Sequence, residues 1–443
     1  MSNKIWINVT TSKQWRGPVV GIVRTEIEIV KQLLALYTDE VKLCEKTIKG
    51  FIEVSIEEYT NKYTREEKDS KPKKKYHNKK NLLTEYIARL NRHKKEGNLL
   101  WHIIPKPFRK LFYTLGVKPN NTKIYYENNN KNIDLSIFNE GDTFISLGLD
   151  WDYGISQQLW DIKHKRKTNI VTICYDLIPI KYPQYVTSGI GVNFSEHILE
   201  CAQASDLMLC ISERTKEDLS EYLDYLGCRK PDIKTIELGS HETVLKKEAV
   251  RPEVSNILNE KFILYVSTIE RRKNHEVLYK AYHKLLASGK TSIPKLIFVG
   301  MKGWLVEELL HDINNDPLIQ DYIFILGRVN DYELELLYQK CQFTVFPSLY
   351  EGWGLGVSES LRRGKFVLSS SSGSLPEAGK KYASYIDPWD VNEWVKQIEY
   401  YSSNASELET KNMIIKQDYI SVSWENTAKS IYGLLFLISN KNR

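Results

Sequence analysis

The sequence has no apolar run long enough to cross a bilayer. The longest stretch, near Leu434–Ile438, is far shorter than the ~18 residues that a membrane-spanning helix needs. The first ten residues, MSNKIWINVT, are too poor in apolar side chains for a signal peptide. We therefore exclude a membrane span and expect a cytoplasmic protein without a secretory leader.

Paired cysteines, metal-ligand spacings and a dinucleotide fingerprint are also missing. The 6 cysteines form no C-x-x-C pair and several lie in apolar runs, which favours buried thiols in a reducing compartment. No His/Cys ligand spacing occurs, and the nearest Asp-x-Asp match, Asp150-Trp151-Asp152, lies far from the motifs described below, so we expect no metal. Gly189-Ile190-Gly191 lacks the third glycine of G-x-G-x-x-G and follows no strand, which disfavours a dinucleotide oxidoreductase.

The charge of the chain is unevenly distributed. The net charge is +6, but residues 71–118 contain 14 Lys or Arg against 2 Asp or Glu and carry +12, which leaves −6 on the rest. Basicity confined to one segment argues against a nucleic-acid-binding protein. The length of 443 residues allows two or more domains, each with its own core.

The most informative stretch runs from Thr344 to Pro376. A short apolar run, Phe343–Phe346, predicts a buried strand; a glycine-dense loop follows, then a helix over 357–363 and a second strand over 366–368. This strand–loop–helix–strand order is the unit of a parallel α/β sheet. Ligands of such sheets bind outside the carboxyl ends of the strands, where this loop lies.

The residues of this loop suit a nucleotide-sugar. The glycines let the backbone approach a bulky anion, and the N-terminus of the following helix is a ready site for a diphosphate. A carboxylate beside a phosphate would be repelled, so Glu351 and Glu359 are better suited to accept hydrogen bonds from sugar hydroxyls. The residues that we predict to bind the donor here are Gly352, Gly354, Leu355, Gly356 and Glu359, beside Glu351.

The segments FPSLYEGWGLGVSESL, SLPEAG and YIDPWD resemble family 4 of the retaining glycosyltransferases, which have the two-domain GT-B fold. Glu351 and Glu359 match the E-x7-E signature of that family, and the resemblance implies that the first contacts the donor sugar and the second the ribose. Gly356 stands where many relatives have proline; it keeps the backbone amide but loosens the loop. Glu377 in SLPEAG is expected to brace this loop by hydrogen bonds.

The resemblance continues in the segment STIERRKNHEV. Arg272 and Lys273 match a Glu-x-Arg-Lys-Asn run, and we expect them to neutralise the departing diphosphate. Asn274 is expected to cap the helix that begins at His275. Gly327 and Arg328 end a later strand and are assigned to the base and ribose by position alone.

In the N-terminal half, two loops supply further candidates. Gly17 and Gly21 form a strand-to-helix turn, and Arg24 follows one turn into a helix over about 22–36. The resemblance implies a loop that closes an interdomain cleft, and the alternative is a plain turn. Asp176 follows the strand Ile170–Cys174, either as a ligand of substrate hydroxyls or as a structural cap. Tyr175 replaces the histidine that the family often has.

The basic segment 71–118 interleaves cations with aromatic and aliphatic side chains. Such a segment can lie on an anionic membrane surface. The alternatives are an insertion packed on the domain with a solvated basic face, and nucleic-acid contact, which no binding motif supports.

These patterns predict an α/β protein of the GT-B fold, with two Rossmann-like, doubly wound parallel-sheet domains facing a cleft. We assign residues 1–245 to an acceptor domain with a basic insertion at about 60–130, and residues 256–422 to the donor domain. An irregular linker over about 238–260 joins them, and a helix over 423–443 crosses back onto the first domain.

The function that we expect is retaining transfer of a mannose-like hexose from a nucleotide-diphosphate sugar, without a cofactor. The acceptor would be a glycan or lipid-linked glycan in surface-polysaccharide synthesis. We predict Glu351, Arg272, Lys273 and Asp176 as catalytic residues. The protein would be cytoplasmic, peripheral on the inner face of the membrane if residues 71–118 bind lipid. A catalytically silent scaffold subunit is the alternative.

Overall fold

The computed structural model describes residues 3–17, 19, 21–65, 133–187, 190–240 and 247–441. By its internal contacts the chain divides into two units, residues 57–134 and the remainder. The described part of the smaller unit consists mainly of α3 (Ile56–Arg65), which has Glu57 and Glu58 in its first turn, where carboxylates complement the helix dipole. The basic segment 71–118 lies outside the described residues, so its contact with a membrane stays a prediction.

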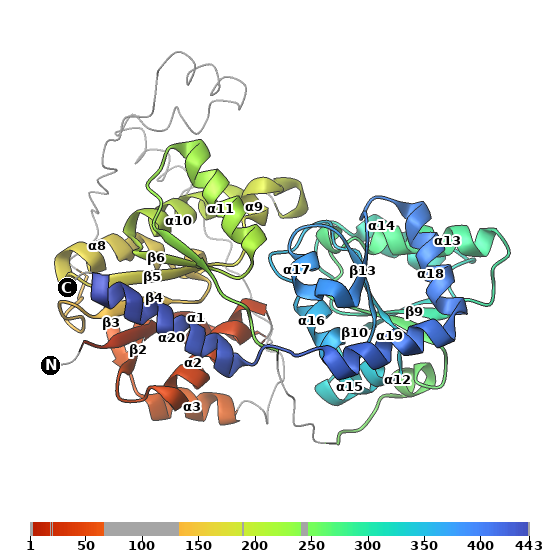
Figure 1. Ribbon diagram of the computed structural model, residues 1–443, viewed down its shortest axis with the longest axis horizontal. Helices are drawn as coiled ribbons and strands as arrows, with labels where there is room; N and C mark the ends of the chain where they lie inside the picture. Colours follow the sequence, from red (N-terminus) through yellow and green to blue (C-terminus); the bar gives the residue numbers. More distant parts are fainter. Residues whose placement is uncertain are drawn as a thin grey trace, which may run out of the picture. The chain divides into compact units, whose positions relative to one another are not determined.

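The larger unit contains two α/β sheets (Figure 1). The first sheet has the order β3-β2-β1-β4-β5-β6-β7 and the second the order β10-β9-β8-β11-β12-β13. The strands of the first are β1 (Ile5–Asn8), β2 (Val41–Lys46), β3 (Phe51–Val54), β4 (Thr143–Ser146), β5 (Asn169–Cys174), β6 (Leu207–Cys210) and β7 (Asp232–Thr235). Those of the second are β8 (Phe262–Val266), β9 (Lys295–Val299), β10 (Ile323–Gly327), β11 (Thr344–Phe346), β12 (Val367–Ser370) and β13 (Ala383–Ile386).

These sheets confirm the predicted fold class of two doubly wound α/β domains. We call the residues around the first sheet (3–56, 135–240 and α20, defined below) the N-terminal lobe, and residues 247–423 the C-terminal lobe. Neighbouring strands in each sheet pair in parallel, except at one edge. The central strands are buried on both faces, as expected when helices cover a parallel sheet.

The exception is β3, which pairs with β2 in antiparallel register, Leu43 opposite Val54. Only a tight turn joins the two strands, closed by the Thr47 N–H donating to the Gly50 carbonyl at 2.7 Å. So short a connection permits only antiparallel pairing, because a parallel pair needs a crossover of a dozen or more residues. This edge strand was not predicted from the sequence.

The helices of the N-terminal lobe are α1 (Thr10–Gln14), α2 (Gly21–Leu36), α7 (Asp150–Tyr153), α8 (Ser156–Arg166), α9 (Ile178–Lys181), α10 (Ile190–Ala204) and α11 (Glu213–Leu226). Those of the C-terminal lobe are α12 (Pro252–Ile257), α13 (His275–Ala287), α14 (Glu307–Asn315), α15 (Asp331–Lys340), α16 (Leu355–Arg362), α17 (Leu375–Gly379), α18 (Val391–Ser403) and α19 (Ala405–Asp418). Ser212 caps α11, because its side chain accepts a hydrogen bond from the Thr215 N–H.

The predicted linker is wrong in part, because α12 lies within the stretch expected to be irregular. Its Val254 and Ile257 belong to the core of the C-terminal lobe, together with Phe262 and Leu264 of β8. Pro252 occupies the first turn of this helix, where its missing N–H costs nothing. The regular structure of the second lobe therefore begins by Pro252.

The last helix, α20 (Trp424–Lys441), packs beside α2 of the N-terminal lobe (Figure 1). The rings of Tyr37 and Tyr432 stack with centroids 3.6 Å apart. The Tyr432 hydroxyl donates to the Glu40 carboxylate at 2.7 Å. The C-terminal segment thus returns to the first sheet.

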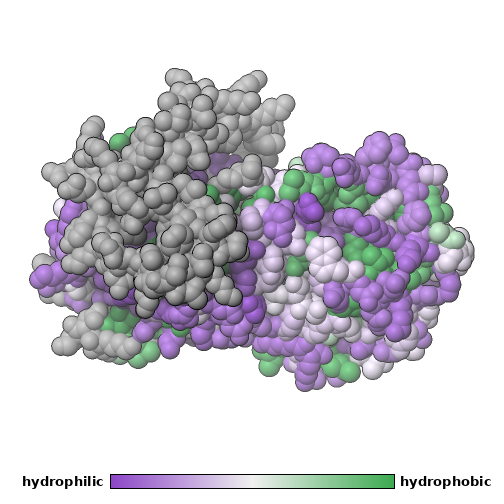
Figure 2. All heavy atoms as spheres, turned by 90° about the horizontal axis from the view of Figure 1, so that it is seen from above, coloured by the Kyte–Doolittle hydropathy of each residue, from purple (hydrophilic) through white to green (hydrophobic). Residues whose placement is uncertain are grey.

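In the part of the chain that the structure describes, no helix has both the length and the apolarity to cross a bilayer. In the view of Figure 2, hydrophilic side chains cover most of the described surface, with small apolar patches between them.

Candidate active site

The glycine-rich loop joins β11 to α16 at the carboxyl edge of the second sheet. Gly354 has a φ of +143°, which residues with a Cβ rarely adopt. A Cβ on Gly352 would lie 2.3 Å from the carbonyl oxygen of Tyr175. The course of the loop and its packing against the segment after β5 therefore both require glycine.

Gly356 has a packing role that the sequence did not indicate, and its predicted loosening of the loop stays a prediction. It lies in the first turn of α16, and a Cβ there would be 2.2 Å from Cε1 of the buried Phe346. The Phe346 ring already fills the space that a side chain would need. Glycine at this position lets α16 pack closely on the end of β11.

Glu351 lies at the centre of an ion-pair cluster. Its carboxylate is 2.6 Å from Nη1 of Arg272 and 2.5 Å from Nζ of Lys273. Burial alone raises the pKa of the Glu351 carboxyl, but the charges of Arg272 and Lys273 outweigh burial and hold its pKa at about 2. Glu351 is therefore ionised at neutral pH and cannot serve there as a proton donor.

The local backbone explains why the two cations point at one carboxylate. They lie in a 3-10 turn, Arg271–Lys273, that follows β8, and Glu270 holds the second guanidinium nitrogen of Arg272 at 2.8 Å. Burial raises the pKa of the Glu270 carboxyl, while Arg272 and Lys273 oppose the rise. Two carboxylates thus fix the Arg272 side chain.

The predicted capping role of Asn274 is wrong. Asn274 adopts a left-handed conformation with φ of +56°, and its side chain makes no hydrogen bond to the first turn of α13. Its amide instead donates to the carbonyls of Pro347 and Pro388, at 3.1 and 2.8 Å. This residue ties the basic turn to two neighbouring loops.

A cavity of about 310 Å³ lies beside this cluster; we call it the donor cavity. Residues of both lobes line it. The predicted site residues that line it are Gly21, Asp176, Lys273, Glu351, Gly352, Gly354, Leu355 and Gly356. Residues that are far apart in the sequence thus meet at one cavity.

Asp176 has a structural contact and also lies at the donor cavity, and its predicted binding of substrate hydroxyls stays a prediction. Its Oδ1 accepts a hydrogen bond from the Ile178 N–H at 2.9 Å at the start of α9, so it is a structural cap. It also lines the donor cavity. Burial raises the pKa of its carboxyl, and the Arg272 charge opposes the rise.

Other predicted site residues do not line the donor cavity. Arg24 and Glu359 pair with each other, with Nη1 and Oε1 3.7 Å apart. Arg272 does not line the cavity; its guanidinium bonds to the Glu351 carboxylate, which does, and to the Tyr350 carbonyl. Gly327 is the last residue of β10 and Arg328 follows it; β10 is an edge strand two positions from β8, and neither residue lines the cavity.

The sequence reasoning also missed residues that line the cavity, chiefly Tyr265 and Ser348. The Tyr265 hydroxyl donates to the Lys273 carbonyl at 2.7 Å, and burial raises the pKa of that hydroxyl. Tyr265 is near the end of β8, and Ser348 follows β11. Their positions at the carboxyl ends of strands were the signal that could have identified them.

A polar network joins this site to α11. The buried Asp218 carboxylate accepts hydrogen bonds from Lys181, Arg214 and the hydroxyl of Tyr350, the residue before Glu351. We predicted that Glu377 braces its own loop, and this is wrong. Its carboxylate accepts hydrogen bonds from the N–H groups of Glu213 and Arg214 at 2.7 and 2.8 Å. It does so because the first N–H groups of α11 have no partner within their helix.

Comparison with known proteins agrees with this geometry. Residues 246–419 match the family described as "Glycosyl transferases group 1". The chain is 29% identical over 263 residues to the serotype-specific mannosyltransferase WbdA of Escherichia coli, a match that covers 58% of this chain and 32% of WbdA. It is 27% identical to the O-antigen chain mannosyltransferase B of Escherichia coli, covering 51% of this chain and 59% of that protein. The chain thus spans about a third of the length of WbdA.

Two solved structures share the fold over nearly the whole chain. Anabaena HepE in complex with UDP and glucose superposes with a TM-score of 0.59 at 14% identity, covering 98% of this chain and 100% of HepE. Sucrose-phosphate synthase from Thermosynechococcus elongatus gives a TM-score of 0.56 at 15% identity, covering 99% of each chain. The fold is that of the GT-B glycosyltransferases. Within it, residues 246–419 carry the glycosyltransferase group 1 domain.

Proposed function

We propose that this protein is a retaining glycosyltransferase that moves a mannose-like hexose from a nucleotide-diphosphate sugar to a glycan or lipid-linked glycan. The observation that carries the proposal is the convergence of Glu351, Lys273 and the N-terminus of α16 on one cavity. The similarity to O-antigen mannosyltransferases supports the sugar and the role in surface-polysaccharide synthesis.

The donor diphosphate would lie between Lys273 and the first N–H groups of α16, with the charge of Arg272 behind Glu351. Two cations and a helix N-terminus attract an anion, and they would stabilise the negative charge that grows on the leaving diphosphate. Glu351 already pairs with both cations, so the diphosphate would share them with a fixed carboxylate. Its low pKa keeps Glu351 an acceptor for sugar hydroxyls.

The reaction that we propose occurs on one face of the sugar. The bond from the anomeric carbon to the diphosphate oxygen breaks, and its electron pair leaves with the diphosphate. The acceptor oxygen forms its bond to the same face, and its proton passes to the departing diphosphate oxygen. The products are the glycoside with retained configuration and the nucleoside diphosphate, and no group on the protein changes its protonation state.

Metal independence belongs to this proposal. Among the described residues, no group of three or more His, Cys, Asp or Glu side chains could hold a metal ion. We expect EDTA treatment to leave the transfer rate unchanged, and a loss of activity that Mg²⁺ or Mn²⁺ restores would contradict this part of the proposal. Peripheral membrane attachment through residues 71–118 is likewise proposed, and vesicle pelleting with and without that segment tests it.

The decisive experiment is transfer from a panel of GDP-, UDP- and dTDP-hexoses, with the anomeric configuration of the product read by NMR. We expect Lys273→Ala to lower kcat about 10²–10³-fold, as loss of one charge-stabilising contact does. Lys280→Ala is the matched control, because Lys280 forms an exposed ion pair with Glu276 on α13. Equal rates for the two variants, or an inverted product, would refute the assignment. Donor binding without turnover would instead support the silent scaffold.

A further inference from the structure

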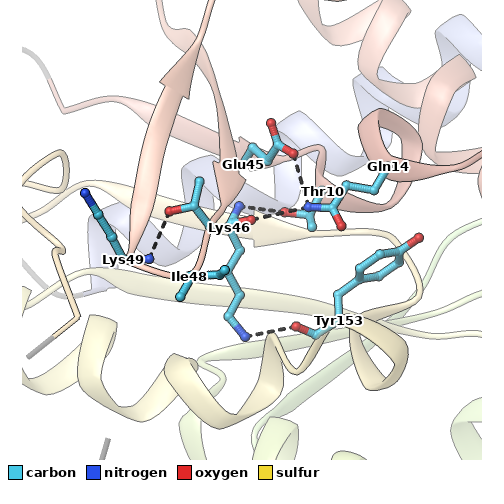
Figure 3. A pocket seen from close by; sticks show the side chains of 8 residues that line it. Thr10, Gln14, Glu45, Lys46, Ile48, Lys49 and Tyr153 are labelled. Carbon is cyan, nitrogen blue, oxygen red and sulfur yellow. Dashed lines mark hydrogen bonds between the residues drawn. The ribbon is translucent and has the colours of Figure 1, made fainter. Parts of the chain in front are cut away.

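A second, larger cavity lies in the N-terminal lobe (Figure 3); we call it the edge cavity. Its volume is about 600 Å³, and it shares no residue with the donor cavity. The side chains that define its chemistry are those of Gln14, Glu45, Lys46, Ile48, Lys49 and Tyr153.

The edge cavity lies where three adjacent strands end. Gln14 is in α1, which follows β1; Lys46 is the last residue of β2; Tyr153 ends α7, which follows β4. The donor cavity is lined by Tyr175 and Ile211, among others, which are the residues that follow β5 and β6 of the same sheet. Both cavities therefore open at the carboxyl edge of the first sheet, where ligands of parallel sheets bind.

Hydrogen bonds hold the edge cavity in shape. The Lys46 ammonium donates to the carbonyls of Tyr153 and Gly154, at 2.9 and 2.6 Å, and so joins β2 to α7. The Gln14 amide donates to Oε1 of Glu45 at 3.1 Å, and Lys13 holds the other carboxylate oxygen of Glu45 at 3.1 Å. Because these contacts cross between separate elements, the cavity is formed before any ligand enters.

The lining suits a neutral ligand with many hydroxyls. An amide, a carboxylate and ammonium groups supply donors and acceptors side by side, which is what sugar hydroxyls need because each both donates and accepts. The Tyr153 ring and the fully exposed Ile48 offer apolar surface to the C–H faces of a sugar. An anion would meet the Glu45 carboxylate, and the Lys46 ammonium is already committed to two carbonyls.

We propose that the edge cavity binds sugar units of a neutral oligosaccharide acceptor that are distant from its reacting end. The proposal rests on the transferase function proposed above. It predicts that the enzyme binds long acceptors more tightly than short ones. The middle strand of the edge cavity, β1, is two strand spacings from β5 and three from β6, so the centres of the two cavities are roughly 10–15 Å apart along the sheet edge. A single sugar cannot occupy both cavities, whereas an oligosaccharide can.

The test uses the full chain and two probes, an α-linked mannose disaccharide and a pentasaccharide. Isothermal calorimetry without donor measures the Kd of each probe, and transfer assays measure the KM. The variants are Tyr153→Ala, which removes the ring, and Gln14→Ala, an exposed change that poses little risk to folding. The matched aromatic control is Trp160→Ala, because Trp160 is 43% exposed on α8 of the same lobe and does not line the edge cavity.

We expect Tyr153→Ala to raise the Kd and KM of the pentasaccharide about tenfold, which corresponds to about 1.4 kcal/mol. The disaccharide values and kcat should stay within twofold, and Trp160→Ala should change nothing. Gln14→Ala should act in the same direction as Tyr153→Ala, which separates loss of contact from misfolding.

Three outcomes would overturn the proposal. The first is equal affinity of the wild type for the disaccharide and the pentasaccharide, and the second is no binding of the pentasaccharide. The third is that inorganic phosphate binds more tightly than the pentasaccharide and that Tyr153→Ala abolishes this phosphate binding. Failure of the proposed function has a different signature: no donor supports transfer to either probe, while calorimetry still reports whether the edge cavity binds the pentasaccharide.

Discussion

Because of the ion-pair cluster around Glu351, we expect the free energy of unfolding of this protein to fall as the pH becomes acidic. Glu351 has a side chain only 13% exposed, and its two cations hold its pKa at about 2 instead of the ordinary 4.5. At about 1.4 kcal/mol per pKa unit, that difference corresponds to roughly 3 kcal/mol of folding free energy. Glu351→Gln keeps the shape of the side chain and removes this contribution.

The sign of the effect follows from the depressed pKa. The stabilisation is complete above the unfolded-state pKa of 4.5 and is lost as the pH falls through the folded-state pKa of about 2. The variant should therefore be about 3 kcal/mol less stable than the wild type at pH 7. At pH 3 the gap should shrink to about 1.4 kcal/mol, because the carboxyl is by then protonated in the unfolded state while it is still mostly ionised in the folded state.

Urea unfolding at a series of pH values between 7 and 3 measures this gap. Glu276→Gln is the matched control, since Glu276 is 57% exposed in its pair with Lys280 and should show a gap near zero throughout. A gap between wild type and Glu351→Gln that stays constant from pH 7 to 3 would refute the reasoning. So would a variant more stable than the wild type at pH 7, because an isolated pair of buried cations should destabilise the fold.

Three further predictions concern packing and buried charge. Tyr350→Phe should lower the free energy of unfolding by about 1 kcal/mol in urea melts, because the Asp218 carboxylate loses one of its several donors. Gly356→Ala should destabilise by about 1–3 kcal/mol in the same assay, since its Cβ would lie 2.2 Å from the ring of Phe346; an unchanged midpoint would show that the ring moves freely. Burial raises the pKa of Asp150 to about 7, so its carboxylate costs stability as the pH rises from about 4 to 7. Asp150→Asn should flatten that decline, and an unchanged pH profile would contradict it.

The sequence by itself determined the elements of this protein and much of its site. Strand-length apolar runs located β5, β11 and β12, because buried parallel strands need continuous apolar residues. The spacing of Glu351 from the glycines and the basic run that contains Lys273 identified residues that meet at the donor cavity. These features are local, so they can be predicted from short segments.

Only the tertiary structure decided which distant residues meet. Asn274 looks like a cap in sequence, yet its amide bonds to Pro347 and Pro388, because the three loops converge at one sheet edge. Glu377 binds the N-terminus of α11, 164 residues away along the chain. The edge cavity, too, depends on strand order, which places the ends of β2, β1 and β4 side by side. Strand order and loop packing arise from contacts between segments far apart in the chain, and no local pattern encodes them.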